Sequence, residues 1–298
     1  MAKPFLKWAG GKRQLIEEIS SRFPSELQNH STYIEPFVGG GAVLFHLLEK
    51  KDFEHVHIFD INPELTLCYE MLKTSAPKVW SKLKSMIKKY PPHESKERSE
   101  YYYSIRTSWN KNVSKIHSMS ETKKINRVAQ TIFLNKTCFN GLFRVNRKGE
   151  FNVPIGSYKN PSFPSEQDLL EVQSALADVI IHLGSFEQCE KFIDENTFLY
   201  FDPPYRPLSE TSHFVSYSKG QFDDEDQKKL AQFVQDVDEK GAKFILSNSD
   251  PKNTIEDDNF FDDLYNGFSI DRVLCNRAIN SKASKRGPVT ELLIGNCW

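Results

Sequence analysis

The sequence has few cysteines and no regular cysteine pattern. Its five cysteines are scattered over 298 residues and none belongs to a C-x-x-C pair. An odd number at such wide spacing argues against a disulfide framework and against a zinc site. We therefore expect no metal site. We also expect most of the cysteines to be small buried residues: Cys68, Cys138, Cys189, Cys275 and Cys297.

Long hydrophobic runs are also absent. No segment approaches the roughly 20 consecutive apolar residues that a membrane span needs. The N-terminus, Met1 to Trp8, lacks the apolar core and cleavage site of a secretory signal. Hydrophobic residues make up 39% and charged residues 27%, as in ordinary globular proteins. These features predict a cytoplasmic protein without a membrane partner.

Net charge is nearly absent, at −1, so only its local distribution is informative. From Asn135 to Asn160 a single acidic residue, Glu150, stands among basic ones. Such a cluster either binds phosphates through its local field or is a solvated face, and charge alone does not distinguish the two. The basic residues are Lys136, Arg144, Arg147, Lys148 and Lys159.

Hydrophobic periodicity predicts an α/β chain with a helical interruption. Residues 66–165 have helical patterns and no convincing strand alternation. The simplest organisation is one α/β domain, residues 1–65 and 166–298, interrupted by an inserted, mainly helical domain at 66–165. The predicted strands are 33–37, 56–60, 179–183, 197–201, 242–246 and two within 270–297 around a loop at 280–287. The strands at 33–37, 179–183 and 197–201 are expected to be buried. Predicted helices include 12–23, 42–48 and 224–240, the last ended by Gly241.

A glycine-rich turn connects the first strand to the next helix. Glycines allow close backbone approach to a ligand, and the following helix offers free N–H groups. The turn runs from Glu35 to Gly41 and lacks the G-x-G-x-x-G spacing of dinucleotide sites. Taken alone, it also fits a tight connection without a ligand.

Asp60 stands at the end of the second strand, about 20 residues after the turn. This position suits an acceptor for ribose hydroxyl groups. It also suits an N-cap, because the sequence from Asp60 to Pro63 fits the start of a helix at Glu64. Beside the glycine turn, ribose binding is the favoured interpretation.

The strand at 197–201 is followed directly by Asp202, Pro203, Pro204 and Tyr205. Two prolines fix the backbone, remove two N–H donors and leave carbonyl groups available. Asp202 and the Pro203 carbonyl can accept the two hydrogens of an aromatic amine, and Tyr205 can stack on its ring. The alternative is a stiff turn that carries a surface acid.

These motifs, in this order, resemble the Dam-type DNA adenine methyltransferases nearly end to end. The resemblance implies a Rossmann-like sheet that binds S-adenosylmethionine and carries an inserted DNA-recognition domain. The segment from Pro4 to Lys12 resembles the family's N-terminal motif. The implied cofactor contacts are Trp8, Lys12, Phe37, Gly39, Gly41, Asp60, Ser185, Phe186 and Asp202. Some relatives have an acid where Ser185 stands.

The segment from Asn135 to Pro154 resembles the recognition hairpin of members that methylate adenine in GATC. By this resemblance Arg144 recognises guanine, while Asn140 and Leu142 fill the space beside an extruded base. Arginine matches the guanine edge with two hydrogen bonds, although a contact to phosphate is the commoner role of an arginine. The implied DNA contacts are Lys7, Phe139, Asn140, Leu142, Arg144, Asn146, Pro154 and Lys159.

Two further features bear on DNA binding. Ser157 stands where relatives often have arginine, so Lys159 is expected to supply the phosphate contact. The segment from Ser281 to Gly287 resembles a loop that some relatives place against DNA.

The resemblance implies methyl transfer to N6 of adenine in duplex DNA, within GATC, by base flipping and direct in-line transfer. We expect a monomer without an obligate protein partner. Related motifs also serve methyl transfer to RNA bases, cytosine N4 and protein glutamine. A catalytically silent DNA-binding protein is the alternative from another class. The residues do not distinguish restriction–modification, housekeeping and phage roles.

Overall fold

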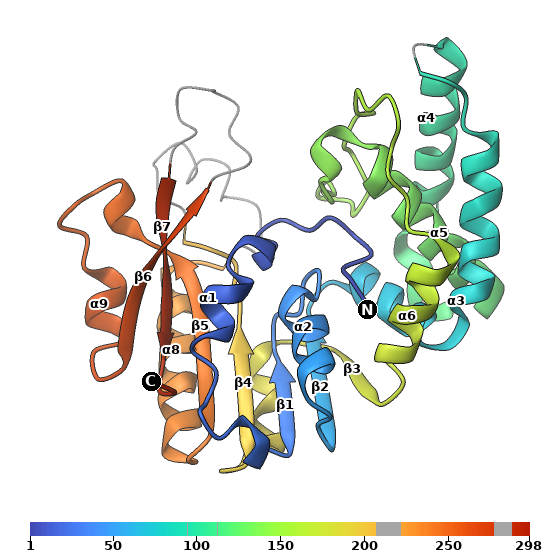
Figure 1. Ribbon diagram of the computed structural model, residues 1–298. Coiled ribbons are helices and arrows are strands. Elements are labelled where there is room, and N and C mark those ends of the chain that lie inside the picture. The colour runs from blue at the N-terminus through green and yellow to red at the C-terminus, as the bar shows by residue number, and fades with distance from the viewer. Residues whose placement is uncertain (94, 112, 207–221, 277–287) are drawn as a thin grey trace. The chain divides into compact units, whose positions relative to one another are not determined.

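The computed structural model describes residues 1–93, 95–111, 113–206, 222–276 and 288–298 (Figure 1). The chain forms two compact units, each interleaved with the other in sequence. We call them the helical unit and the sheet unit. The helical unit consists of Met1–Gly11, Gly39–Glu49 and Asp60–Leu183, and the sheet unit consists of Lys12–Val38, Lys50–Phe59 and Gly184–Trp298.

The strands form a seven-stranded sheet in the order β3-β2-β1-β4-β5-β7-β6. β1 pairs in parallel with β2 and β4, and β4 pairs in parallel with β5. β7 is antiparallel to both β5 and β6. The bounds are β1 (Thr32–Glu35), β2 (His55–Asp60), β3 (Val179–Leu183), β4 (Thr197–Phe201), β5 (Lys243–Ser249), β6 (Ser269–Asn276) and β7 (Pro288–Gly295).

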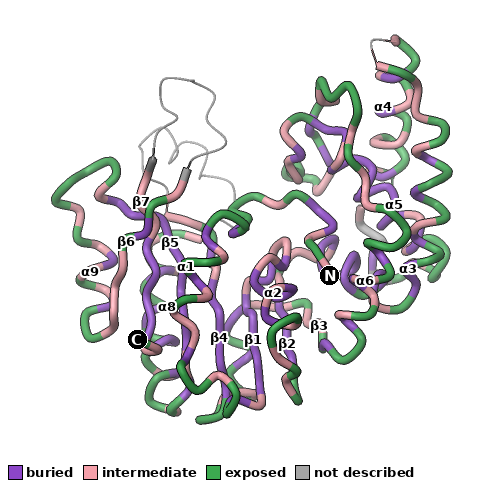
Figure 2. Tube along the Cα trace, in the orientation of Figure 1, coloured by how far each residue is buried: buried purple, intermediate pink, exposed green. Residues whose placement is uncertain are grey.

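Burial on both faces explains the continuous apolar composition of the central strands. Every residue of β1 and β4 is buried, and Figure 2 shows these strands as buried throughout. Parallel strands covered on both faces carry such runs instead of an alternating pattern. The prediction of buried strands at these two positions is confirmed.

Helix α8 (Asp224–Glu239) packs against β5 and covers one part of the sheet unit. A capping box between Asp223 and Asp226 starts the helix, and Gly241 follows its end at φ +81°. The predicted apolar face is buried and belongs to the core of this unit: Leu230, Phe233, Val234 and Val237. The helix and its end are as the sequence predicted.

Two predictions about individual elements are wrong. β3 is not buried: Ile180 is 44% and Leu183 43% exposed, because this strand lies at the edge of the sheet. The expected helix at 12–23 is broken into a 3-10 turn η1 (Lys12–Gln14) and a short α1 (Ile16–Ser20). Pro24 disfavours the helical conformation for Phe23, so the helix cannot extend to the expected end.

The helical unit contains the long helices between β2 and β3. α3 is interrupted at Ser75, where φ is −147°, just before Pro77, and it packs against α5, α6 and β3. The bounds are α2 (Ala42–Lys50), α3 (Pro63–Lys89), α4 (Lys96–Asn110), η3 (Val113–Ser118), α5 (Glu121–Thr137), η4 (Phe139–Gly141) and α6 (Glu166–Ala175). The remaining elements belong to the sheet unit: η2 (Leu27–Asn29), η5 (Phe186–Phe192), η6 (Pro251–Asn253) and α9 (Phe260–Leu264).

A buried ion pair ties α5 to the start of α3. Arg127 is 2% exposed; its Nε donates to Glu64 at 2.7 Å and a second guanidinium nitrogen contacts the same carboxylate. The guanidinium also lies over the ring of Trp109, 4.0 Å from its centre. Glu64 lies on α3, Trp109 on α4 and Arg127 on α5, so this cluster joins the three helices. Removing one member of the ion pair would leave the other as a buried, unpaired charge.

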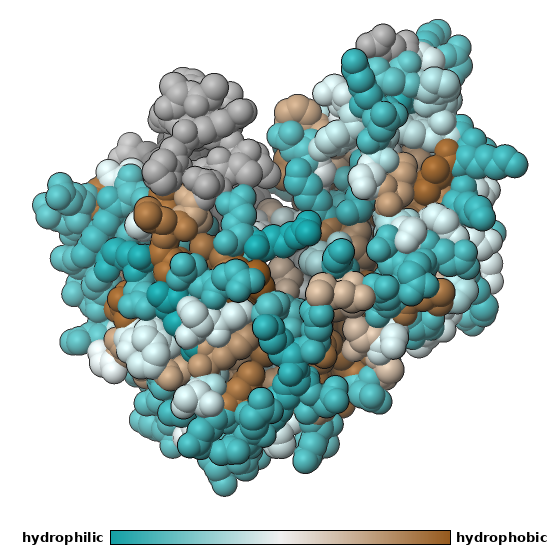
Figure 3. All heavy atoms as spheres, viewed as in Figure 1, coloured by the Kyte–Doolittle hydropathy of each residue, from teal (hydrophilic) through white to brown (hydrophobic). Residues whose placement is uncertain are grey.

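The surface and the cysteines agree with the composition. Figure 3 shows a largely hydrophilic face with hydrophobic residues scattered over it. Within the described ranges, no helix is both long and apolar enough to cross a bilayer. Cys68, Cys138 and Cys189 are buried, as expected, while Cys275 and Cys297 are partly exposed.

The division into a catalytic domain and a recognition domain at 66–165 does not coincide with the two compact units and remains a prediction.

Candidate active site

The Asp-Pro-Pro-Tyr segment after β4 is held by side chains from other elements of the sheet unit. The ammonium Nζ of Lys12 lies 2.6 Å from Asp202 Oδ1, and Ser247 on β5 donates to the same oxygen at 3.2 Å. Lys12 is only 4% exposed, and its ammonium also lies 4.5 Å from the centre of the Tyr205 ring. The segment therefore binds a nitrogen donor beside an aromatic ring.

The prolines and the tyrosine are fixed from α8 and β7. Gln227 is a fully buried residue of α8, and its side chain donates to the Pro204 carbonyl at 3.1 Å. Pro203 is buried. The Tyr205 hydroxyl donates to Glu291 on β7. These contacts tie Pro204 and Tyr205 to α8 and β7.

Burial controls the ionisation of this loop. It raises the pKa of Asp202 above its ordinary value, and the neighbouring Glu291 raises it further. The Lys12 ion pair and the hydrogen bond from Ser247 oppose the rise. Burial also raises the pKa of Tyr205 well above its ordinary value, so this residue is a neutral phenol.

Parallel pairing brings several predicted motifs to one edge of the sheet. β2, β1 and β4 run in parallel, so their carboxyl ends lie at the same edge. The glycine turn follows β1, Asp60 ends β2, and Asp202 follows β4. Ligands of open α/β sheets bind outside this edge.

Two of the predicted cofactor residues in the sheet unit are stacked phenylalanines. The rings of Phe37 and Phe186 lie 5.6 Å apart with an interplanar angle of 30°. Phe186 is only 5% exposed and belongs to the core. Ser185 precedes η5, and its carbonyl accepts from the Gln188 amide at 3.2 Å. The sheet unit therefore offers an apolar wall here, and the cofactor contacts of these residues remain predictions.

In the helical unit the glycine turn has no room for side chains. Gly39 and Gly41 have φ of +49° and +72°. A Cβ on Gly41 would lie 2.5 Å from the Tyr69 hydroxyl oxygen. The same hydroxyl donates to the Gly39 carbonyl at 3.0 Å. The turn is thus a tight backbone cradle fixed by α3.

Asp60 contacts this turn directly. Its Oδ2 accepts from the Gly39 amide at 3.2 Å, and its Oδ1 accepts from the Asn62 amide at 2.8 Å. Asn62 is the N-cap of α3, since its side chain accepts from the Glu64 amide. The alternative that Asp60 caps the helix is therefore wrong. Burial raises the pKa of Asp60, and these two N–H donors oppose the rise.

The predicted recognition segment is a short hairpin. Val145 and Phe151 form an antiparallel bridge, closed by a turn in which Gly149 has φ +77°. The side chain of Asn146 accepts from two amides of that turn and donates to Glu150. Arg144 is exposed and donates to Asn152 at 2.8 Å. Of the predicted DNA contacts on this hairpin, Arg144 is presented to solvent and Asn146 is engaged in the turn.

The other predicted DNA contacts lie at or near the surface. Phe139 is 51% exposed, and Asn140 has φ +56°, which asparagine tolerates better than most residues. Leu142 is half-buried. Pro154 is exposed and its carbonyl accepts from Phe139. Lys7, Ser157 and Lys159 are exposed, while the loop expected at 280–287, with the predicted DNA contact from Ser281 to Gly287, lies outside the described residues.

Helix α4 supports the hairpin in a way that the sequence analysis missed. Four polar side chains spaced four residues apart contact main-chain atoms of the segment 151–159. Asn110 pairs with both the amide and the carbonyl of Phe151, at 2.8 and 3.1 Å. Tyr102 and Arg106 donate to the Val153 carbonyl, and Arg98 donates to the carbonyls of Tyr158 and Lys159. The regular spacing along one helical face was a signal that could have identified this role.

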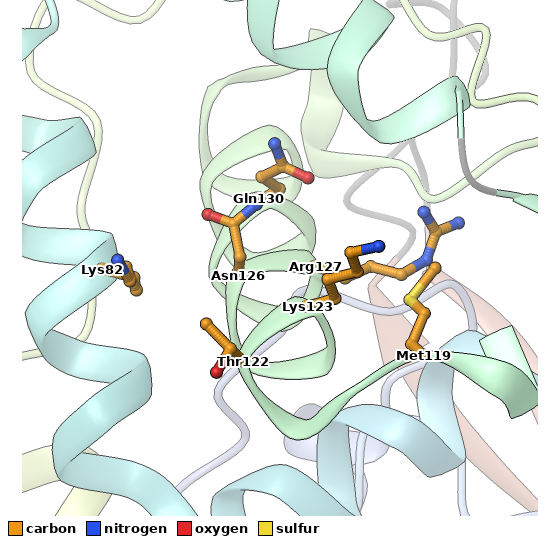
Figure 4. A pocket seen from close by; sticks show the side chains of 7 residues that line it. All are labelled: Lys82, Met119, Thr122, Lys123, Asn126, Arg127 and Gln130. Carbon is orange, nitrogen blue, oxygen red and sulfur yellow. The ribbon is translucent and has the colours of Figure 1, made fainter. Parts of the chain in front are cut away.

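Two hollows lie away from these predicted residues. One, of about 260 Å³, is formed in the helical unit by side chains of α3 and α5 and by Met119, which precedes α5 (Figure 4). The other, of about 280 Å³, lies in the sheet unit at the amino ends of β1 and β2, opposite the edge that carries Asp60. In the described part of the chain, no group of three or more histidine, cysteine or acidic residues could hold a metal ion. The residues that line the first hollow are Lys82, Met119, Thr122, Lys123, Asn126, Arg127 and Gln130.

The fold and this edge of the sheet define a Rossmann-like methyltransferase. The sequence model of the D12 class N6 adenine-specific DNA methyltransferases matches residues 8–279. The chain belongs to this family, and it is an adenine-specific DNA methyltransferase that acts at N6.

Relatives that match nearly the whole chain are also named methyltransferases or methylases. The chain is 48% identical to the type II methyltransferase M.MjaIII of Methanocaldococcus jannaschii, with 99% of each chain covered. It is 37% identical to the type II methyltransferase M1.LlaDCHI of Lactococcus lactis subsp. cremoris, over 99% of this chain and 95% of the relative. It is 33% identical to the DNA adenine methylase of Haemophilus influenzae, over 98% of this chain and 92% of the relative.

DNA methyltransferases of this family use S-adenosylmethionine as methyl donor. The residues of each unit fit this molecule chemically. The helical unit supplies a carboxylate, Asp60, for ribose hydroxyls and a glycine turn without side chains, and the sheet unit supplies the apolar pair Phe37 and Phe186. Which of these residues touch the cofactor remains a prediction.

Proposed function

We propose that this methyltransferase modifies adenine within GATC in duplex DNA, after extruding the base from the helix. The observation that carries the proposal is the pairing of a nitrogen donor with Asp202 beside the Tyr205 ring. A carboxylate that accepts N–H bonds next to an aromatic face suits the amine of a flat base. GATC is supported by the resemblance of the hairpin sequence to that of members that methylate GATC. Relatives named DNA adenine methylase support adenine as the modified base.

In the proposed reaction, Asp202 and the Pro203 carbonyl accept the two N6 hydrogens and orient the nitrogen lone pair. Tyr205 stacks on the extruded base. Asp202 has no need to remove a proton before transfer. The amine becomes strongly acidic once it is methylated, and it loses its proton afterwards. S-adenosylmethionine, when bound, supplies a methyl group on a positively charged sulfur. Positioning and fixed hydrogen bonds provide most of the rate enhancement.

The substrate amine has to replace the Lys12 ammonium at Asp202. Both are N–H donors, so the exchange preserves the pairing of the buried carboxylate. Lys12 then becomes available for the cofactor contact that the N-terminal motif predicts. The loop itself stays fixed, since Ser247, Gln227 and Glu291 hold it independently of Lys12.

Recognition is proposed to come from the helical unit, within residues 66–165. Arg144 is exposed on the hairpin, where it can donate two hydrogen bonds to a guanine edge. Phe139, Asn140 and Leu142 are proposed to occupy the space beside the extruded base, and Lys159 to contact phosphate. One copy of the chain carries all of these residues, so we propose that a monomer acts on cellular DNA in the cytoplasm.

The test is the pattern of methylated bases in DNA from an expressing host. Digestion and mass analysis should give N6-methyladenine, and sequencing should place it in GATC. Methylation of adenine at another sequence would contradict the GATC proposal alone. Base flipping is tested with 2-aminopurine at the target position, whose fluorescence should rise when the purified protein binds; unchanged fluorescence in a methylation-competent complex would contradict it.

A further inference from the structure

The N-terminal segment touches both the glycine turn and the recognition hairpin within the helical unit. The rings of Trp8 and Phe143 stack with centres 5.2 Å apart and an interplanar angle of 23°. The indole also packs on the turn, since a Cβ on Gly39 would lie 3.1 Å from Trp8 Cδ1. One side chain therefore contacts a predicted cofactor element and a predicted DNA-recognition element.

A buried amide fixes the backbone on both sides of this stack. Asn135, only 1% exposed, accepts from the Lys7 amide and donates to the Lys7 carbonyl, both at 2.8 Å. It also donates to the Gly141 carbonyl at 2.9 Å. Gly141 has φ +66°, which favours glycine, and a Cβ there would lie 3.2 Å from Lys7 Cβ. Asn135 thus joins the residue before Trp8 to the start of the hairpin.

Phe143 lies between Leu142, which is proposed to occupy the space beside the extruded base, and Arg144, which is proposed to recognise guanine. Its ring contacts Phe151 and Trp109 edge to face, with ring centres 5.8 and 6.1 Å away. The ring is therefore held against the helical unit on one side and against Trp8 on another. A change in the position of Trp8 has to be accommodated by Phe143, because packed side chains cannot overlap.

We propose that Phe143 is a positioning residue that couples cofactor binding to DNA recognition. Cofactor that fixes Trp8 on the glycine turn also fixes the ring of Phe143, and with it the backbone that carries Arg144. The hairpin then loses less conformational entropy when it binds DNA. By thermodynamic reciprocity, cognate DNA tightens cofactor binding by the same factor. This inference rests on the proposed function, because it uses Trp8 as a cofactor contact and the hairpin as the DNA contact.

The test is the coupling factor, measured as the ratio of dissociation constants for a GATC duplex without and with saturating S-adenosylhomocysteine. This molecule is the demethylated product of the cofactor, so it binds without turnover. For the unaltered protein we expect the duplex to bind on the order of tenfold more tightly when S-adenosylhomocysteine is bound. Phe143→Leu should bring the ratio close to one. Phe143→Tyr, which keeps the stacked ring, should retain most of the coupling.

Phe163→Leu is the matched control. Phe163 is likewise a half-buried phenylalanine of the helical unit that stacks on one aromatic ring, Phe133, at 5.8 Å. Its replacement removes the same atoms without touching Trp8, so the coupling factor should stay at the value of the unaltered protein. Thermal unfolding of the three variants would show whether each is folded at the temperature of measurement.

The outcomes separate this inference from the proposed function. A Phe143→Leu protein that methylates GATC and keeps the full coupling factor would overturn the positioning role alone, as would loss of coupling in Phe143→Tyr or a ratio of one in the unaltered protein. Failure of the unaltered protein to methylate GATC would overturn the proposed function instead. Loss of coupling in Phe143→Leu only, with methylation of GATC retained, supports the inference.

Discussion

The loop after β4 and the recognition hairpin are both assigned to function, yet they are built in opposite ways. In the loop, Asp202 is paired with the buried Lys12 and bonded to Ser247 within the fold. On the hairpin, Arg144 is exposed and uses its Nε for a hydrogen bond to Asn152, while Phe139, just before the hairpin, is 51% exposed. The carboxylate of the loop is bonded within the fold, whereas the side chains at the hairpin are largely accessible. Methyl transfer needs hydrogen-bond acceptors in fixed positions, whereas DNA recognition needs side chains that the DNA can reach.

The largest effect is expected at the loop. Asp202→Asn should lower methyl transfer by about 10²–10³-fold, because it replaces the charged carboxylate that accepts from the target amine by a neutral amide with one, weaker acceptor oxygen. Cofactor affinity should change little. Single-turnover transfer of a labelled methyl group, together with calorimetric cofactor binding, measures both.

A matched control for that variant is Asp52→Asn, which changes an exposed carboxylate of the same unit. It should transfer methyl groups at the normal rate. Thermal unfolding accompanies the comparison, since Asp202→Asn leaves the buried Lys12 without its charged partner. Normal turnover by Asp202→Asn would remove this residue from the mechanism.

The next largest effect is expected on the hairpin. Arg144→Ala should relax discrimination at one base pair of the site by about 1–3 kcal/mol. Competition between GATC and single-base variants measures the loss. Arg147→Ala, which removes another exposed arginine of the same turn, should leave discrimination intact. If Arg144→Ala instead weakens all duplexes equally and lessens the salt dependence, Arg144 contacts phosphate.

A smaller effect should separate cofactor binding from helix capping. Asp60→Ala should weaken S-adenosylmethionine binding by roughly tenfold, through loss of hydrogen bonds to a charged acceptor. Asn62→Ala should instead lower the free energy of unfolding by about 1 kcal/mol, since Asn62 caps α3, and should leave cofactor affinity unchanged. Calorimetry and chemical unfolding of both variants provide the measurements, and an unaltered affinity for Asp60→Ala would exclude the ribose contact.

The smallest effect is expected in the pH dependence. Asp202 accepts the amine as a carboxylate, so the rate should rise with pH through its elevated pKa. Glu291→Gln removes a neighbouring charge that raises this pKa, so the acidic limb of the rate profile should move to lower pH. The same elevation means that ionising Asp202 costs folding stability as pH rises from its ordinary pKa to the elevated one. An acidic limb that does not move in Glu291→Gln would show that another group sets it.

Local sequence predicted the positions of most elements. Apolar runs gave β1 and β4, and the spacing of four apolar residues gave α8 with its end at Gly241. The same reasoning failed for β3, because an apolar pentapeptide does not reveal that it lies at a sheet edge. It failed again for the helix expected at 12–23, which is broken at Leu15 and ends at Ser20; the proline at 24 accounts only for the exclusion of Phe23.

The roles of the predicted site residues remain predictions. Their positions relative to the strands are as expected: the glycine turn follows β1, Asp60 ends β2 and Asp202 follows β4. Ser247, Gln227 and Glu291, which contact the loop after β4, were not predicted. They come from β5, α8 and β7, and nothing near them in the sequence marks a site.

The sequence by itself determined the chemistry that this protein carries, because a strand followed by Asp-Pro-Pro-Tyr and an earlier strand followed by glycines are local patterns with local physical causes. Only the tertiary structure decided what surrounds that chemistry: that Lys12 pairs with Asp202, that Asn62 caps α3 while Asp60 meets Gly39, and that Trp8 stacks on Phe143. Each of these contacts joins residues whose neighbourhood is set by how strands and helices pack, and packing depends on the whole chain.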